Sequence, residues 1–173
     1  MNDSSFRETF SQVMGPEHQR KALVVDTRFN GGGWLHDDLV TFLSGKDYIQ
    51  FFPRGQNNMG SEPMFKWSKP SAVLIGEGNY SDAHMFPFAY KELKIGKLIG
   101  MPVPGTGTAV WWETLIDPTL YFGIPQVGMR ARDGKLLENT QLEPDIQVRN
   151  LPEDVTAGRD RQLEAAVKHL LGK

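Results

Sequence analysis

The sequence contains no cysteine. Disulfides, thiol nucleophiles and zinc–thiolate centres are therefore excluded, and the redox compartment cannot be inferred. Neither sign of charge dominates, since 19 basic and 21 acidic residues give a formal net charge of −2. We therefore expect no broad attraction to nucleic acid or to an anionic membrane. No run approaches the roughly 20 apolar residues of a membrane-spanning helix, so membrane insertion is not expected. Residues 1–5 lack the basic and apolar regions of a signal peptide.

The remaining composition fits one globular domain. The chain has 173 residues, of which 39% are hydrophobic, and 18 glycines and 11 prolines predict many turns. Residues 22–25 and 71–75 are short apolar runs typical of strands that are buried on both faces. Each is followed by a glycine-containing turn and then by a helical pattern, over 35–43 and 81–93. This alternation favours an α/β fold with parallel strands.

Other elements are predicted around these two units. We expect a helix over 3–14, capped by Asp3 or Ser4, and a last helix over 158–171. A strand is predicted over 48–52, an exposed excursion over 53–70 and a short strand at 98–99. Short strands and turns are predicted over 101–148. The last helix is expected to place its apolar residues on one side, with a solvated charged face opposite: Leu163, Ala166, Val167, Leu170 and Leu171.

The first segment with chemical potential is the run from Asp26 to Gly33, DTRFNGGG. Three glycines after a buried strand allow the backbone to approach another group closely, and their N–H groups can form an anion site such as an oxyanion hole. The alternative is an ordinary flexible turn. The run is neither a P-loop nor a dinucleotide fingerprint, because it lacks the residues and spacing of both.

The second segment is EGNYSDAH, in which Ser81 lies where a strand has ended and a helix begins. A hydroxyl at this position lies in the positive field of the helix N-terminus, and the following Asp82 N–H would lie beside it. The alternative is a serine that only caps the helix. Both segments follow predicted parallel strands, where open α/β sheets place their sites, so Gly33 and Ser81 are expected to share one crevice.

Three runs occur in order over about residues 20–150: VVDTRFNGGG, EGNYSDAHMFPFAYKELKIGKLIG and LENTQLEPDI. They resemble the tricorn-type branch of the C-terminal processing peptidase family. These serine proteases show an Asp-x-Arg-x-Asn-Gly-Gly-Gly segment and a nucleophilic serine at a helix start. A Gly-Lys-Leu-x-Gly strand and a Pro-Asp-Ile/Val strand follow. The resemblance implies a ClpP/crotonase-like layered sheet with flanking helices.

By position, the resemblance makes Ser81 the nucleophile and makes the N–H groups of Gly33 and Asp82 the oxyanion-hole donors. Glu138 matches the acidic member of the tricorn catalytic tetrad, which orients the site through a serine and the catalytic histidine. We assign Gly32 and Thr106 to substrate binding.

Two departures from the family concern the general base. The other branch uses a lysine 25 residues after the nucleophile, where this chain has Thr106 in Gly-Thr-Gly. The tricorn branch uses a histidine before the glycine-rich strand, where this chain has only His18, outside the family's Ser-His context. We therefore expect residues 1–173 to be a single catalytic core, the C-terminal fragment of a longer protease. Its base-bearing N-terminal region and a PDZ domain would lie outside the fragment.

The remaining histidines and aromatic residues are less informative. His84 would share a helix face with Ser81, but one turn along the same helix it is poorly placed to accept the hydroxyl proton. A surface or supporting role is expected for it, and none is assigned to His36 or His169. The aromatic run at Trp111 and Trp112, with Tyr121 and Phe122, is expected in the core rather than in a substrate groove. The region that determines specificity is expected near 51–54, without a preference for basic residues.

The predicted function is peptide-bond hydrolysis through an acyl-enzyme on Ser81, without a metal or cofactor. The expected partners are peptides or unfolded proteins, with homo-oligomers possible and nucleic acid not expected. Two alternatives stay open: a non-catalytic peptide-binding module and a crotonase-type acyl-CoA enzyme. Only family habit favours an extracytoplasmic location.

Overall fold

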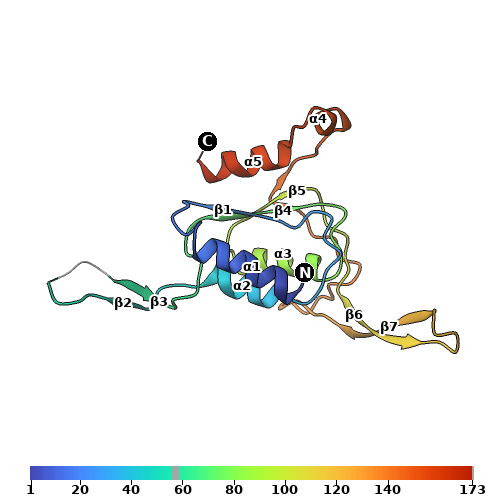
Figure 1. Ribbon diagram of the computed structural model, residues 1–173. Coiled ribbons are helices and arrows are strands. Elements are labelled where there is room, and N and C mark those ends of the chain that lie inside the picture. Colours follow the sequence, from blue (N-terminus) through green and yellow to red (C-terminus); the bar gives the residue numbers. More distant parts are fainter. Residues whose placement is uncertain (56–58, 173) are drawn as a thin grey trace.

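A four-stranded parallel sheet forms the centre of the protein in the computed structural model, which describes residues 1–55 and 59–172 (Figure 1). Its strands lie in the order β1 (Leu23–Asp26), β4 (Ser71–Ile75), β5 (Lys97–Gly100) and β8 (Ile146–Gln147). All three pairings are parallel. The predicted α/β class is therefore confirmed.

Helices cover both faces of this sheet (Figure 1). One face packs against α1 (Asp3–Met14), α2 (His36–Ser44) and α3 (Asp82–Glu92). The other face packs against α5 (Arg161–Leu170), which follows the short helix α4 (Pro152–Thr156). Strand β4 lies between the two layers and is buried throughout, which explains its uninterrupted apolar sequence.

Two antiparallel hairpins project from the body in opposite directions (Figure 1). The first pairs β2 (Ile49–Phe51) with β3 (Gly60–Glu62), and the second pairs β6 (Thr108–Thr114) with β7 (Tyr121–Gly128). The predicted excursion over 53–70 thus includes the return strand of a hairpin, and its residues 56–58 lie outside the described part of the chain. Over 101–148 the prediction of only short strands was wrong, because β6 and β7 have 7 and 8 residues.

Several local predictions were also wrong. Asn2, rather than Asp3 or Ser4, caps α1, and its side chain accepts a hydrogen bond from the Ser5 N–H. Strand β1 is only partly buried because it is an edge strand. The predicted last helix is confirmed as α5, but of its predicted apolar side only Ala166 is fully buried. In the described part of the chain, no helix is long and apolar enough to cross a membrane.

Candidate active site

The two segments singled out in the sequence lie together because β1 is paired with β4 along its whole length, with Asp26 beside Leu74 near the end of β4. The turn after β4 is fastened to the end of β1 by a buried polar relay. Thr27 donates its hydroxyl to the Leu74 carbonyl at 2.8 Å, and the Asn79 amide donates to Thr27 Oγ1 at 2.9 Å. Asn79 also donates to the Ala83 carbonyl at 2.9 Å, so the turn that presents Ser81 is held at both ends.

Ser81 has the backbone of a strained strand-to-helix turn, with φ 55° and ψ −120°. A non-glycine residue with positive φ costs free energy, and such residues cluster at functional sites. The Ser81 side chain makes no capping hydrogen bond to α3, so the interpretation as a simple helix cap was wrong. The hydroxyl is thus available for chemistry.

The glycine run lies directly against this turn. The Tyr80 N–H donates to the Asn30 carbonyl at 3.0 Å, and the Asn30 side chain accepts from the Gly32 N–H at 2.8 Å. A Cβ on Gly32 would lie 2.8 Å from Ser81 Cβ and 3.0 Å from the Asp82 nitrogen. Only glycine fits this contact. The backbone of Met1 packs against Gly33 on the outer side, and its ammonium group donates to the Gly32 carbonyl at 2.5 Å.

Some of the backbone N–H groups around Ser81 are engaged, and others are free within the described residues. The Ser81 N–H donates to Thr106 Oγ1 at 2.9 Å. Within the described residues, the N–H groups of Gly33 and Asp82 donate to no acceptor. They are therefore available to an oxyanion, and they are the two groups that the sequence resemblance assigns to that role.

Thr106 connects the serine turn to Glu138. The neighbouring Gly107 N–H donates to Glu138 Oε2 at 2.9 Å, and the Asn139 N–H donates to the Gly105 carbonyl at 3.0 Å. Glu138 is exposed and is connected to the Ser81 turn through this Gly-Thr-Gly segment. Thr106 thus has a second task besides any contact with substrate, because its side chain holds the backbone of the nucleophile.

His84 is buried, with 1% of its surface exposed, so the alternative of a surface position was wrong. Burial lowers its pKa, while a hydrogen bond to the Thr106 backbone and the Glu138 charge act in the opposite direction. Its Nδ1 has no hydrogen-bond partner among the described residues. The Ser81 hydroxyl likewise has no histidine partner in the described part of the chain.

His36, to which the sequence analysis assigned no role, belongs to the site. Its Nδ1 lies 2.5 Å from an oxygen of the Asp82 carboxylate, which is itself only 1% exposed. A carboxylate at the start of a buried helix requires a hydrogen-bonding partner. This requirement was the one feature of the sequence that could have indicated a partner for Asp82.

A cavity of about 560 Å³ opens beside Ser81 and is also lined by Gly33 and Thr106. None of its lining residues is charged, and its apolar lining includes Trp34, Met85, Ala109, Val110, Trp112 and Met129. The expectation that Trp111 and Trp112 lie in the core was wrong, because they are 58% and 64% exposed. Residues 51–54 do not line this cavity; Phe51 lies on the other hairpin.

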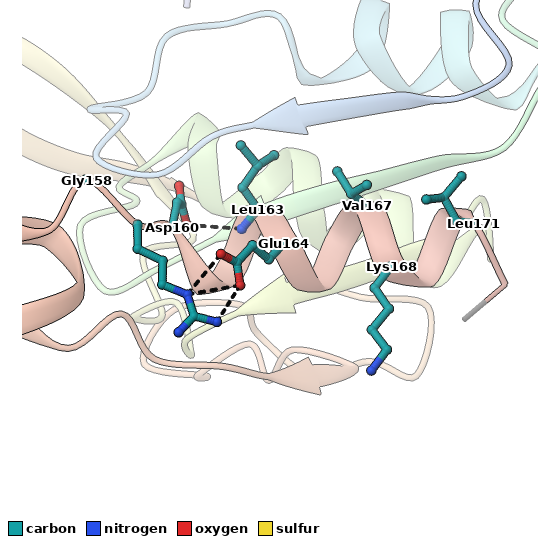
Figure 2. Close-up of a pocket in the computed structure, with 8 residues that line it drawn as sticks. Gly158, Asp160, Leu163, Glu164, Val167, Lys168 and Leu171 are labelled. Carbon is teal, nitrogen blue, oxygen red and sulfur yellow. Dashed lines mark hydrogen bonds and ion pairs between the residues drawn. The ribbon is translucent and has the colours of Figure 1, made fainter.

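A second cavity lies along α5, on the opposite face of the sheet (Figure 2). Leu163, Val167 and Leu171 form its apolar side, and Arg159 pairs with Glu164 beside them at 2.9 Å. It contains neither the serine nor the glycine run, so the cavity at Ser81 is the candidate active site. The described residues contain no group of three or more His, Cys, Asp or Glu side chains able to hold a metal ion.

A serine on a strained turn, beside unpaired N–H groups at the end of a parallel sheet, is typical of a serine hydrolase. The family model for peptidase family S41 matches residues 1–148, and the chain belongs to this family. The sequence-based recognition and the fold class are thereby confirmed.

Similar proteins place the chain near tricorn proteases. It is 34% identical over 164 residues to a tricorn protease homolog of Saccharolobus solfataricus and 30% identical over 164 residues to the tricorn protease of Thermoplasma acidophilum. These alignments cover 92% and 94% of the chain but only 15% of either relative. The chain thus spans about a seventh of the length of these relatives.

Solved structures agree with this placement. The crystal structure of the tricorn protease superposes with a TM-score of 0.77 at 27% identity, over 88% of this chain and 15% of that one. The photosystem II D1 C-terminal processing protease superposes with a TM-score of 0.62 at 21% identity, over 90% of this chain and 42% of that one. The second likeness shows the shared fold alone.

Proposed function

We propose that the chain is the catalytic core of a serine-type peptidase that hydrolyses peptide bonds through an acyl-enzyme on Ser81. The observation that carries the proposal is the strained turn that presents the unpaired Ser81 hydroxyl beside the free N–H groups of Gly33 and Asp82. In this mechanism Ser81 attacks the scissile carbonyl, and the two N–H groups hold the oxyanion that develops. Each such donor stabilises the transition state by about 3 kcal/mol.

The general base comes from outside the described residues in this proposal. None of the described histidines contacts the Ser81 hydroxyl, and Thr106 occupies the position of the lysine in the other branch of the family. The chain covers only 15% of its tricorn relatives. We propose that a part of the protein outside these residues supplies the histidine and a PDZ domain. In this proposal Glu138, which accepts a hydrogen bond from the Gly-Thr-Gly segment, helps to orient that histidine.

The cavity supports uncharged peptide side chains as substrates. Its lining holds no acidic residue to pair with lysine or arginine, and burying an unpaired charge there is costly. Trp112 and Met85 offer apolar surface in the same cavity as Ser81. The proposed substrates are therefore peptides or unfolded proteins with apolar side chains at the cleavage site. We also propose that the protein assembles with further copies of itself.

The rival function is a peptide-binding module without catalysis, and the base that the described residues lack favours it. The acyl-CoA alternative has no support in the comparisons, which find peptidases. The deciding experiment measures cleavage of fluorogenic peptides by the full-length protein and by Ser81→Ala. Turnover that disappears in the variant supports the peptidase. Peptide binding without turnover in a folded protein supports the binding module.

A further inference from the structure

The carboxylate of Asp82 lies at the junction of the two segments that form the proposed oxyanion hole. It is 1% exposed, and both of its oxygens are engaged across 46 and 47 residues of sequence. Oδ2 accepts the Leu35 N–H at 2.8 Å, and Oδ1 lies 2.5 Å from His36 Nδ1. The same residue thus offers its backbone N–H to the site and its side chain to the opposite segment.

The segment that Asp82 grips is the one that carries the other donor. Leu35 and His36 follow Gly33 after two and three residues and lead into α2. Leu35 is buried, so its N–H and the Asp82 carboxylate depend on each other for hydrogen bonding. The His36 ring also packs edge-on against Trp34, at 5.8 Å between centroids, and Trp34 lines the cavity at Ser81.

We infer that Asp82 and His36 form a clasp that fixes the spacing between the Gly33 and Asp82 N–H donors, which makes His36 a positioning residue of the site. The inference rests on the proposed peptidase function. Oxyanion donors act mainly in the transition state, and small displacements of such groups are costly. Loosening the clasp therefore lowers kcat and leaves KM nearly unchanged, whereas a mere loss of stability changes neither value in the folded protein.

The test compares four variants of the full-length protein. Asp82→Ala and His36→Ala open the clasp. Asp82→Asn keeps an acceptor for the Leu35 N–H and offers an amide donor to the imidazole. Asp38→Ala is the matched control. Asp38 is an exposed acidic residue in the first turn of α2, so its replacement removes the same charge without changing the clasp.

We expect kcat to fall roughly 10- to 100-fold in Asp82→Ala, less in His36→Ala, and to stay within about twofold of wild type in Asp38→Ala. Asp82→Asn should recover at least about tenfold over Asp82→Ala. KM should stay within about twofold throughout. Equal kcat values for wild type, Asp82→Ala and His36→Ala would overturn the inference. If Asp82→Ala does not fold, Asp82→Asn and His36→Ala decide it.

Hydrogen exchange read by mass spectrometry over residues 31–40 separates this inference from the proposed function. If the clasp holds this segment in wild type, amide exchange here rises at least about tenfold in His36→Ala and does not rise in Asp38→Ala. Absence of Ser81-dependent turnover in wild type would contradict the peptidase proposal, but the exchange measurement would still test the clasp. Unchanged amide exchange in His36→Ala would contradict the clasp, whatever the peptidase activity of the variant.

Discussion

Replacing Gly32 by alanine tests the contact on which the site depends. Gly32 has φ 97°, a conformation that costs other residues about 1–3 kcal/mol. Its new Cβ would lie 2.8 Å from both Ser81 Cβ and the Tyr80 carbonyl oxygen, and overpacking of this kind adds typically about 1–3 kcal/mol. The loop can relieve the clash only by moving away from Ser81, which carries Gly33 with it.

The neighbouring Gly31 provides a matched control, because a Cβ there meets no atom within 4 Å. We expect Gly32→Ala to lower the melting temperature by about 4 °C or more, and Gly31→Ala to change stability by no more than about 0.5 kcal/mol. The rate of Ser81 labelling by a fluorophosphonate should fall roughly 100-fold in Gly32→Ala alone. Equal melting temperatures and labelling rates for the two variants would show that the close contact between Gly32 and Ser81 does not matter to the site.

Three further predictions concern groups around the site. Thr106→Val removes the acceptor of the Ser81 N–H and should destabilise the protein by about 1–2 kcal/mol in chemical denaturation, whereas Thr106→Ser should restore it. Arg28 lowers the pKa of Asp160, so their contribution to stability is present above about pH 4 and lost as the pH falls; Arg28→Ala should flatten that part of the stability–pH curve. Burial lowers the pKa of His84, so stability present above about pH 6.5 should decline on acidification towards the lowered value, and a His84→Asn variant should lack this decline.

The sequence predicted those parts of the molecule that local pattern determines. The all-apolar run of β4 requires burial on both faces. Both β1 and β4 are followed by a turn and a helix, and this repeated order implies that the two strands pair in parallel. Because parallel strands end at one edge of a sheet, the sequence also predicted that Gly33 and Ser81 share one crevice. The motif roles of Asp26 and Arg28 became clear only in the fold, where Arg28 bridges Asp26 and Asp160 at 2.6 and 2.8 Å and joins the edge of the sheet to α5.

The parts that sequence could not predict depend on contacts between distant segments. The pairing of His36 with Asp82 is one such contact, because nothing local to His36 distinguishes it from the other histidines. Trp111 and Trp112 were placed in the core because large aromatic residues are usually buried. They are exposed because β6 pairs with β7 in a separate two-stranded hairpin, over which the described residues place no second layer.

Covalent labelling shows whether Ser81 is an activated nucleophile. The full-length protein and Ser81→Ala would be treated with a fluorophosphonate probe, digested and read by mass spectrometry. We expect an adduct on the peptide containing Ser81 that is absent from the variant. A folded protein that forms no adduct at Ser81, or whose labelling persists in Ser81→Ala, would contradict it.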